Sequence, residues 1–238
     1  NARAPQEVLN ALSWQTVLAA RTGYVQSVDS DALLRLAREC DAVIKLECRI
    51  GGFVIERTPL AMVALDRAPD GAFARSLNET VSVKRYRTVE QDAGFGVRQI
   101  VDVALKALSP GINDTTTAVT CLDYLTAILV RLALQRIPSP YRYAEGRLRV
   151  IAFGPTFERL LAHAFTQIMN SAAGNLAVIL RLLRSLEMIA VNTRSPRRRQ
   201  ALRDQLGSIA ELIERSELLA RDRLQVEAVR DRTARALS

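Results

Sequence analysis

The sequence predicts an α+β fold, with a small β-barrel or sandwich-like module over residues 1–88 and a mostly α-helical bundle over residues 89–238. Periodicity supports this division. Apolar and polar residues alternate at period two in the first part, and from Glu90 apolar residues recur at helical spacing. The 238 residues are 49% apolar and 24% charged, which is the composition of a folded domain and excludes disorder and collagen.

Short strands and one helix are predicted for the first module. Branched apolar residues alternate with polar ones between turn-forming residues, which is typical of strands, and Ser30 and Asp31 are suitable helix caps. The predicted elements are a strand over residues 24–28, a helix over residues 30–37, a hairpin of residues 44–50 and 53–55 turning at Gly51 and Gly52, and a strand over residues 59–65. We expect these strands to form a structural module.

Helices with broad apolar faces dominate the second module. Pro110 and Gly111 must end the first of these helices, because neither residue is tolerated in a helix interior, and Asn113 or Asp114 can cap the next one. The predicted elements are helices over residues 90–108 and 114–132, a strand over residues 148–153, a helix from residue 157, and a C-terminal hairpin of residues 176–191 and a long segment from residue 202.

Residues 160–180 carry no formal charge apart from the titratable His163 and have about the length of a membrane-spanning helix. The centre of this run, Asn170 to Asn175, holds amides, a serine and a glycine, which favour a helix break. We therefore expect no membrane span there and a water-soluble chain. The N-terminus has neither an initiator methionine nor a signal-peptide pattern, so we expect a fragment of a longer protein.

The cysteines and the histidine argue against a metal site or a cofactor. Cys40, Cys48 and Cys121 form no CxxC pair, and one histidine cannot complete a zinc site of the usual spacing. Sparse, odd-numbered cysteines suit a reducing compartment. The hairpin at Gly51 resembles that of biotinyl or lipoyl carrier barrels, but no lysine lies at a Met-Lys-Met type tip, so we expect no attached cofactor.

The net charge of +8 comes almost entirely from arginine. The densest cluster consists of Arg194, Arg197, Arg198 and Arg199, which are candidates for contacts with a phosphate, either of a nucleic acid or of a lipid headgroup. No aromatic residues interleave with this cluster, and no helix-turn-helix, RNP or GxxG pattern accompanies it. Nucleic acid is therefore not an expected partner.

The most informative segment of the sequence extends from Arg87 to Ala118. It contains the strings Arg-Thr-Val-Glu-Gln-Asp-Ala-Gly-Phe-Gly-Val-Arg-Gln and Ala-Leu-Ser-Pro-Gly-Ile-Asn-Asp. This segment resembles the signature of a bacterial family of predicted membrane proteins, catalogued as domain of unknown function twenty-two fifty-four. Gly23 to Gln26, Gly52 to Val54 and Pro59-Leu60 also resemble that family's pattern, whereas Thr115 stands where the family often has proline.

The resemblance implies context more than chemistry. Family members usually carry several transmembrane helices before this region, so the chain would be the soluble C-terminal portion of a membrane protein. Arginine richness suggests the cytoplasmic face of the bacterial inner membrane. The family has no established reaction, so the resemblance supplies no catalytic residue.

Two functions from different classes remain open. In the first, the chain is a sensory, scaffold or gating module that self-associates beneath a membrane anchor. In the second, it is an enzyme or a cation-dependent small-ligand-binding domain, because acids beside an asparagine and a threonine can bind a hard cation through oxygen atoms. The residues of that candidate cluster are Asp92, Arg98, Asp102, Asn113, Asp114 and Thr117.

Each member of this cluster also has an ordinary structural interpretation. Arg98 and Asp102 are four residues apart, the spacing of an ion pair on a helix surface, and Asn113-Asp114 is a common helix cap. Self-association is expected from the apolar stripes of the C-terminal segment, which exceed what one antiparallel neighbour can cover. Those stripes are Leu202, Leu206, Ile209 and Ile213, and Leu212, Leu219 and Val226.

Overall fold

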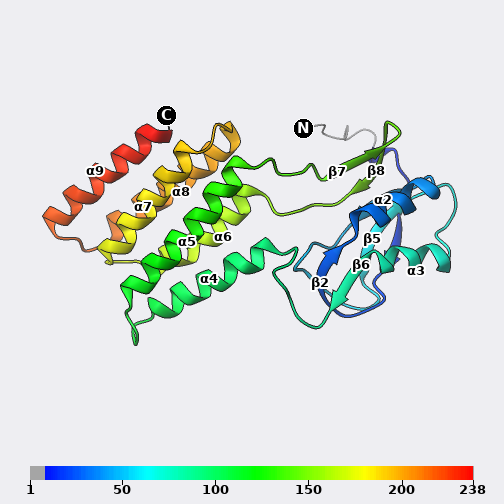
Figure 1. Ribbon diagram of the computed structural model, residues 1–238, viewed down its shortest axis with the longest axis horizontal. Coiled ribbons are helices and arrows are strands. Elements are labelled where there is room, and N and C mark those ends of the chain that lie inside the picture. Colours follow the sequence, from blue (N-terminus) through cyan, green and yellow to red (C-terminus); the bar gives the residue numbers. More distant parts are fainter. Residues whose placement is uncertain (1–8, 238) are drawn as a thin grey trace. The chain divides into compact units, whose positions relative to one another are not determined.

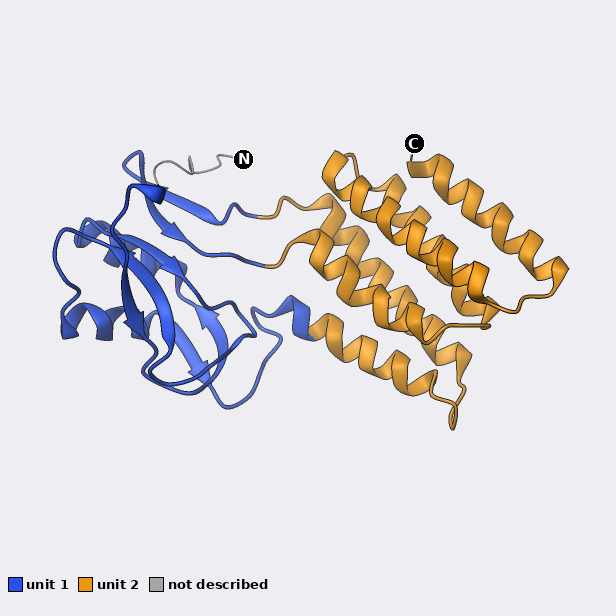
Figure 2. Cartoon of the chain, turned by 180° about the vertical axis from the view of Figure 1, so that it is seen from behind, with its two compact units in different colours: residues 1–95, 138–154 blue, residues 96–137, 155–238 orange. Residues whose placement is uncertain are grey.

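The computed structural model describes residues 9–237, so the prediction that concerns the first five residues lies outside the described part of the chain. The chain forms two compact units (Figure 2), Asn1–Phe95 with Pro138–Gly154, and Gly96–Ile137 with Pro155–Ser238. It passes from one unit to the other three times. The predicted single boundary at residue 88 differs from this division, because residues 138–154 return to the strands of the first unit.

The first unit contains two β-sheets (Figure 1). The five-stranded sheet has the order β1-β5-β3-β8-β7 and the three-stranded sheet the order β4-β2-β6. Their bounds are β1 Gln15–Leu18, β2 Gly23–Val28, β3 Val43–Leu46, β4 Phe53–Val54, β5 Pro59–Ala64, β6 Val81–Lys84, β7 Tyr141–Ala144 and β8 Arg147–Ile151. These described strands do not close into a barrel.

Strand β3 lies at the centre of the larger sheet, between the antiparallel strand β5 and the parallel strand β8. Ile44 is opposite Val150 in the parallel pair, so residues far apart in sequence become neighbours. The predicted hairpin of residues 44–50 and 53–55 is wrong, because β4 pairs with β2 in the other sheet. Tyr24 of β2 is opposite Phe53 of β4, and their rings meet edge to face with centroids 5.0 Å apart.

Among the described elements, helices α2 (Ser30–Glu39) and α3 (Gly71–Glu79) also belong to the first unit. Asp29 caps α2 by accepting hydrogen bonds from the N–H groups of residues 31 and 32, so the cap lies one residue before the predicted Ser30-Asp31 pair. Asp70 caps α3 in the same manner through Phe73 N. Both helices contribute buried side chains to the core that the sheets also line, namely Leu33, Ala37, Phe73 and Leu77.

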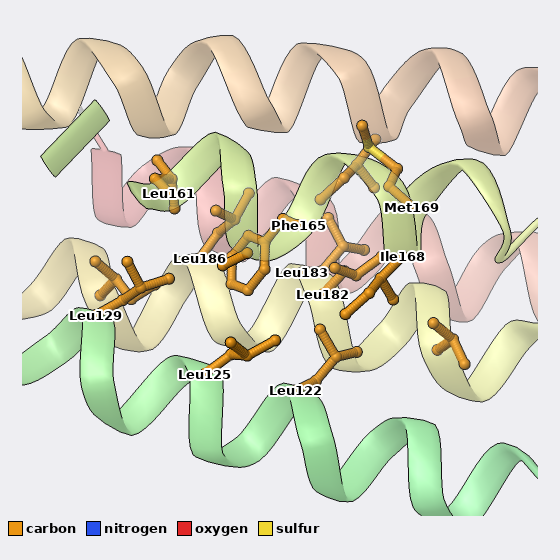
Figure 3. Packing of buried hydrophobic residues seen from close by; sticks show 14 of the residues in the cluster. Leu122, Leu125, Leu129, Leu161, Phe165, Ile168, Met169, Leu182, Leu183 and Leu186 are labelled. Carbon is orange, nitrogen blue, oxygen red and sulfur yellow. The ribbon is translucent and has the colours of Figure 1, made fainter. Parts of the chain in front are cut away.

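The second unit is a bundle of helices (Figure 1). Their bounds are α4 Ala93–Ala107, of which the first three residues belong to the first unit, α5 Thr115–Leu134, α6 Phe157–Asn170, α7 Leu176–Val191, α8 Pro196–Arg215 and α9 Ala220–Leu237. Helix α7 packs against α5, α8 and α9, and α6 packs against α5 and α8. Leucines, isoleucines, valines and alanines from these helices form most of the core, together with the buried Phe157. Figure 3 shows Phe165 and Met169 packed among the leucines.

Polar caps set the ends of the helices in the bundle. Thr156 caps α6, Asn175 caps α7, and Ser195 caps α8 just before Pro196, which occupies the first helical position, where a missing N–H costs nothing. The expected break near Asn170 separates α6 from α7, so residues 160–180 are not one helix.

The α+β fold class is confirmed, but one expected helix is two. The segment from residue 202 onward divides at Ser216 into α8 and α9. Ser216 donates a hydrogen bond to Leu212 O and accepts one from Gly174 N. Because α9 folds back on α7, Val226 is buried inside the unit together with Leu202, Ile209 and Ile213 of α8.

Candidate functional site

Asp92, the first residue of the predicted cluster, is buried in the first unit at the start of α4. One carboxylate oxygen accepts hydrogen bonds from Arg87 Nε at 3.0 Å and Nη2 at 2.6 Å, and the other accepts one from Phe95 N at 2.9 Å. The guanidinium carbon of Arg87 also lies 4.8 Å from the centroid of the Phe95 ring. Asp92 thereby fastens the preceding loop to the first turn of α4.

Gly51 lies directly against this ion pair. Its φ of +79° is in the left-handed region, which glycine adopts without steric cost. A Cβ at Gly51 would collide with Asp92 Oδ2 and Arg87 Nη2. The backbone of the turn that precedes β4 is therefore packed directly against the Arg87–Asp92 ion pair. We call Gly51, Arg87, Asp92 and Phe95 the Asp92 clasp.

Arg98 and Asp102 form an ion pair on α4, as their spacing predicts, with Nη2 and Oδ1 2.7 Å apart. Both side chains are about half exposed. The same arginine donates a hydrogen bond from Nη1 to Gln167 Oε1 on α6. Exposed pairs at this spacing contribute about 0.3–0.5 kcal/mol, and the hydrogen bond to Gln167 links α4 to α6.

Asp114 caps α5, and its carboxylate accepts hydrogen bonds from the hydroxyl and the backbone N–H of Thr117. The Thr117 hydroxyl, followed by the Thr117 N–H, lowers the pKa of Asp114. Asn113 adopts a left-handed φ of +48°, which asparagine tolerates better than most residues, and so turns the chain into the cap. Thr115 Oγ1 accepts a hydrogen bond from Asn175 Nδ2, which joins the starts of α5 and α7.

The structure divides the predicted cluster into three separate sets of bonds. Asp92 pairs with Arg87, Arg98 pairs with Asp102, and Asp114 bonds to Thr117. Within residues 9–237, no group of three or more His, Cys, Asp or Glu side chains is arranged to hold a metal ion. In this structure each of these polar residues stabilises a helix or a loop beside it.

Two arginines of the predicted phosphate cluster cap the C-terminal ends of other helices. Arg198 donates to the carbonyl groups of Leu132, Ala133 and Gln135 at the end of α5, at 3.3, 2.6 and 2.9 Å. Arg199 donates to Ala190 O, Thr193 O and Ala236 O, at the ends of α7 and α9. These carbonyls carry the negative end of the helix dipole, which explains the preference for a cation.

The other two arginines of the cluster are exposed. Arg197 Nε lies 3.0 Å from Glu158 Oε1 of α6, and 77% of the Arg197 side chain is accessible to solvent. The sequence pattern identified the cluster but could not separate its members, because the end of α5 that Arg198 contacts and the end of α9 that Arg199 contacts lie far away in sequence.

Sequence reasoning missed a cavity of about 600 Å³ in the first unit. It lies between the end of β1, helix α3 and strand β6. Its charged lining residues are Arg21, Arg75, Glu79 and Lys84, and its apolar lining includes Leu18, Val81 and Val83. The signal that could have revealed it is weak, because these residues come from three separate segments and form no motif.

The comparison with protein families explains the signature segment. Residues 1–188 match the model of the family described as predicted membrane protein, DUF2254. The chain belongs to this family. The resemblance that the Arg87 to Ala118 segment suggested is therefore confirmed at the level of the family.

Relatives of this DUF2254 chain include an uncharacterized protein of Mycobacterium bovis and one of Mycobacterium tuberculosis. Each is 31% identical over 215 residues, which cover 88% of this chain and 41% of the relative. The chain thus spans less than half the length of these relatives. No solved structure matches it.

The DUF2254 signature segment forms the Asp92 clasp apart from Gly51, helix α4 and the capped start of α5. One described helix, α5, is long and apolar enough to cross a membrane by length and composition, and 39% of that stretch is buried inside the structure.

Proposed function

We propose that this chain is an extramembrane regulatory module of a larger membrane protein. Its first unit senses a small ligand, and α4 transmits the change to the helical bundle. The family description and the 41% share of the relatives' length support a membrane protein with further segments. A cavity of about 600 Å³ in the first unit has the size of a small-molecule site, which supports a sensory role.

The observation that carries this proposal is the course of α4. The helix is uninterrupted from Ala93 to Ala107, yet its first turn belongs to the first unit and the remainder to the second. The Asp92 clasp holds that first turn, whereas Val97, Val101 and Ala104 are buried in the core of the bundle. A helix is stiff along its axis, so a displacement at the clasp is carried into the bundle.

Helix α5 supports an extramembrane position for the second unit. Its buried face packs in the bundle core, where the hydroxyl groups of Thr126 and Ser185 are hydrogen-bonded at 2.7 Å. Its outer face carries Asp123, which pairs with Arg181 at 3.1 Å, and the exposed Arg131. Asp123 lies near the middle of the helix, where a charged group would be costly in a bilayer, whereas Arg131 lies in the last turn.

The proposed location is the cytoplasmic face of the bacterial inner membrane. The net charge of +8 agrees with the positive-inside tendency of segments close to a membrane. The three cysteines are free in the structure, which agrees with a reducing compartment.

Self-association is the second part of the proposal. The apolar stripe that suggested it is largely covered within the bundle, so a contact between copies needs another surface. Exposed apolar side chains on two helices that pack together offer one: Leu134 on α5, and Met188 and Val191 on α7. Leu134 and Val191 are 67% and 70% accessible, and burying such groups between two copies would be favourable.

An Asp92→Asn substitution tests whether α4 transmits a change from the first unit. It replaces the charge-assisted hydrogen bonds of Asp92 by weaker ones. The partners of Asp92, Arg87 and Phe95, both belong to the first unit. We expect amide hydrogen exchange to become faster along residues 97–107 of α4. Asp70→Asn is the matched control, because Asp70 also caps a helix of the first unit but has no bond to α4. If faster exchange after Asp92→Asn stays within the first unit, the transmission proposal is wrong.

A further inference from the structure

Among the described residues, no strand pairs with the outer edge of β6 in the three-stranded sheet, and this open edge lies beside the cavity. Thr80 O accepts a hydrogen bond from Asp29 N at 2.8 Å, and Lys84 O lies against Gly23, so both carbonyl groups point toward β2. Successive residues of a strand point their peptide groups to opposite sides. The backbone N–H and C=O groups of Val81 and Val83 therefore point away from β2, toward the open edge.

The opposite wall of the cavity is held by Asn78 of α3. Its side-chain amide donates to Leu18 O at 3.0 Å and to Ala74 O at 2.9 Å, and its carbonyl oxygen accepts from Ala20 N at 2.8 Å. Both N–H donors and the carbonyl oxygen of the Asn78 side chain are thus hydrogen-bonded, and these bonds join the end of β1 to α3. The cavity wall is thus formed before any ligand enters, which lowers the entropic cost of binding.

The charge around the cavity is unbalanced. Among the described lining residues, Arg21, Arg75 and Lys84 are cations and Glu79 is the one carboxylate, which leaves an excess of two positive charges. Within the described residues, none of these four side chains takes part in an ion pair, and all four are exposed. Lys84 is one of three lysines in the whole chain.

We propose that this cavity binds a phosphate monoester with an apolar body. A phosphate monoester carries a charge of about −1.5 to −2 at neutral pH, which matches the excess of two positive charges. Arg21 and Lys84 supply charge-assisted donors for its oxygens, and the N–H of Val83 adds a neutral donor at the open edge. The apolar body packs against Leu18, Ala74 and the Val83 side chain.

This assignment rests on the proposed sensory function, and it names the chemical class of the signal. A phosphate monoester with an apolar body can be a soluble metabolite, and it can also be phosphatidic acid in a membrane. The cavity chemistry is the same for both sources, so the experiment needs one arm for each.

The soluble arm measures the binding of phenyl phosphate to the full chain by calorimetry. We expect saturable binding, at least tenfold weaker binding of inorganic phosphate and of benzyl alcohol, and roughly a tenfold loss of affinity in Arg21→Gln and in Lys84→Gln, as for one lost charge-assisted hydrogen bond. Arg35→Gln is the matched control, because Arg35 is exposed on α2 and does not line the cavity. Affinity that is unchanged in both cavity variants overturns the assignment.

The membrane arm measures co-sedimentation of the chain with phosphatidylcholine vesicles that contain phosphatidic acid. Binding that requires phosphatidic acid and is lost in Arg21→Gln and Lys84→Gln, without binding of phenyl phosphate, supports the lipid source. The absence of cavity-dependent binding in both arms overturns the proposal. Binding that depends on the cavity while Asp92→Asn leaves exchange along α4 unchanged would keep the site and refute transmission, so the two failures are distinguishable.

Discussion

Gly51 shows how one residue without a side chain positions a buried charge. The left-handed backbone of Gly51 lets the turn touch the Arg87–Asp92 pair, which a larger residue would push apart. The pair keeps its short Nη2 to Oδ2 distance of 2.6 Å because of this space. The clasp therefore depends on a glycine as much as on its charged members.

We expect Gly51→Ala to destabilise the protein by roughly 1–3 kcal/mol, from the left-handed backbone and the displaced ion pair. Gly111→Ala is the control, because its φ is not left-handed and nothing lies within 4 Å of its added Cβ. Chemical denaturation of both variants measures the difference in the free energy of unfolding. Equal free energies for the two variants would refute the role of Gly51.

Asp114 permits a test that separates a capping role from a ligand-binding role. Asp114→Ala removes the hydrogen bonds to Thr117 and should lower the thermal unfolding temperature at neutral pH, without changing the binding of phenyl phosphate. Asp114→Asn keeps a capping oxygen and should lose much less. A variant with unchanged melting but altered ligand binding would favour a binding role for Asp114.

The pH dependence of stability follows from the lowered pKa values of three aspartates. Hydrogen bonds from Arg149, Phe73 N and Thr117 are the main causes for Asp41, Asp70 and Asp114, respectively. A carboxyl group with a lowered pKa in the folded state stabilises the protein above its ordinary pKa of about 3.9, and this contribution disappears as the pH falls through the folded value. We expect acid unfolding to begin near pH 4, and the dependence to be shallower in Asp114→Asn, as measured by thermal melts from pH 7 to pH 3.

The sequence identified several of these residues but not all their partners. Asp114 as a cap and Arg98–Asp102 as a pair follow from local spacing and were predicted correctly. The contact of Gly51 with Asp92 joins residues about forty positions apart and leaves no periodic signal. The cavity residues come from three segments, so only the fold brings them together.

At the scale of elements, the start of α8 terminates three other helices. Arg198 bonds the end of α5, and Arg199 bonds the ends of α7 and α9. The positive guanidinium groups satisfy carbonyl groups that have no partner within their own helices. Two neighbouring arginines thereby fix the register of the bundle at one end.

We expect Arg198→Gln to lower the free energy of unfolding by roughly 1–3 kcal/mol, because it removes charge-assisted hydrogen bonds to three carbonyl groups. Arg197→Gln removes one exposed ion pair with Glu158 and should cost less than about 1 kcal/mol. Urea denaturation of the two variants compares neighbouring arginines directly. A larger loss for Arg197→Gln would contradict the capping role.

Most of the described helices and strands were predicted because their periodicity is local, but helix α3 and strands β1, β6 and β7 were not predicted. Two errors had a physical cause beyond local pattern. Apolar and polar residues of β3 and β4 alternate on both sides of a Gly-Gly turn, as in a hairpin. In the structure, β3 pairs with β5 in one sheet and β4 pairs with β2 in the other. The end of α8 at Ser216 lacks a proline or a glycine, and a hydrogen bond from the distant Gly174 N helps to hold that end.

For the whole molecule, we expect the 238-residue chain to be extracted in aqueous buffer without detergent. The face of α5 that carries Leu122, Leu125 and Leu129 is buried in the bundle, and a polar break divides residues 160–180. Fractionation of cells that express the chain measures this. Recovery only in detergent micelles would contradict the extramembrane proposal.

Light scattering over a dilution series should show a mass above that of the monomer at high micromolar concentration. Leu134→Glu and Val191→Glu should dissociate the oligomer, and Leu224→Glu is the control, because Leu224 is exposed on α9. Truncation after residue 195 is not a clean test, because it removes the helices that cover α7. A monomeric mass across the series would refute self-association.

The parallel pairing of β3 with β8 has a consequence for synthesis on the ribosome. Ile44 leaves the exit tunnel more than a hundred residues before its neighbour Val150, so β3 has an open edge while α4 and α5 are made. Open edges invite pairing with other chains, and contacts of such sequence separation form slowly. The nascent first unit should therefore bind chaperones until residue 151 emerges. In a chain that ends at residue 88, β8 is missing and the edge of β3 would stay open.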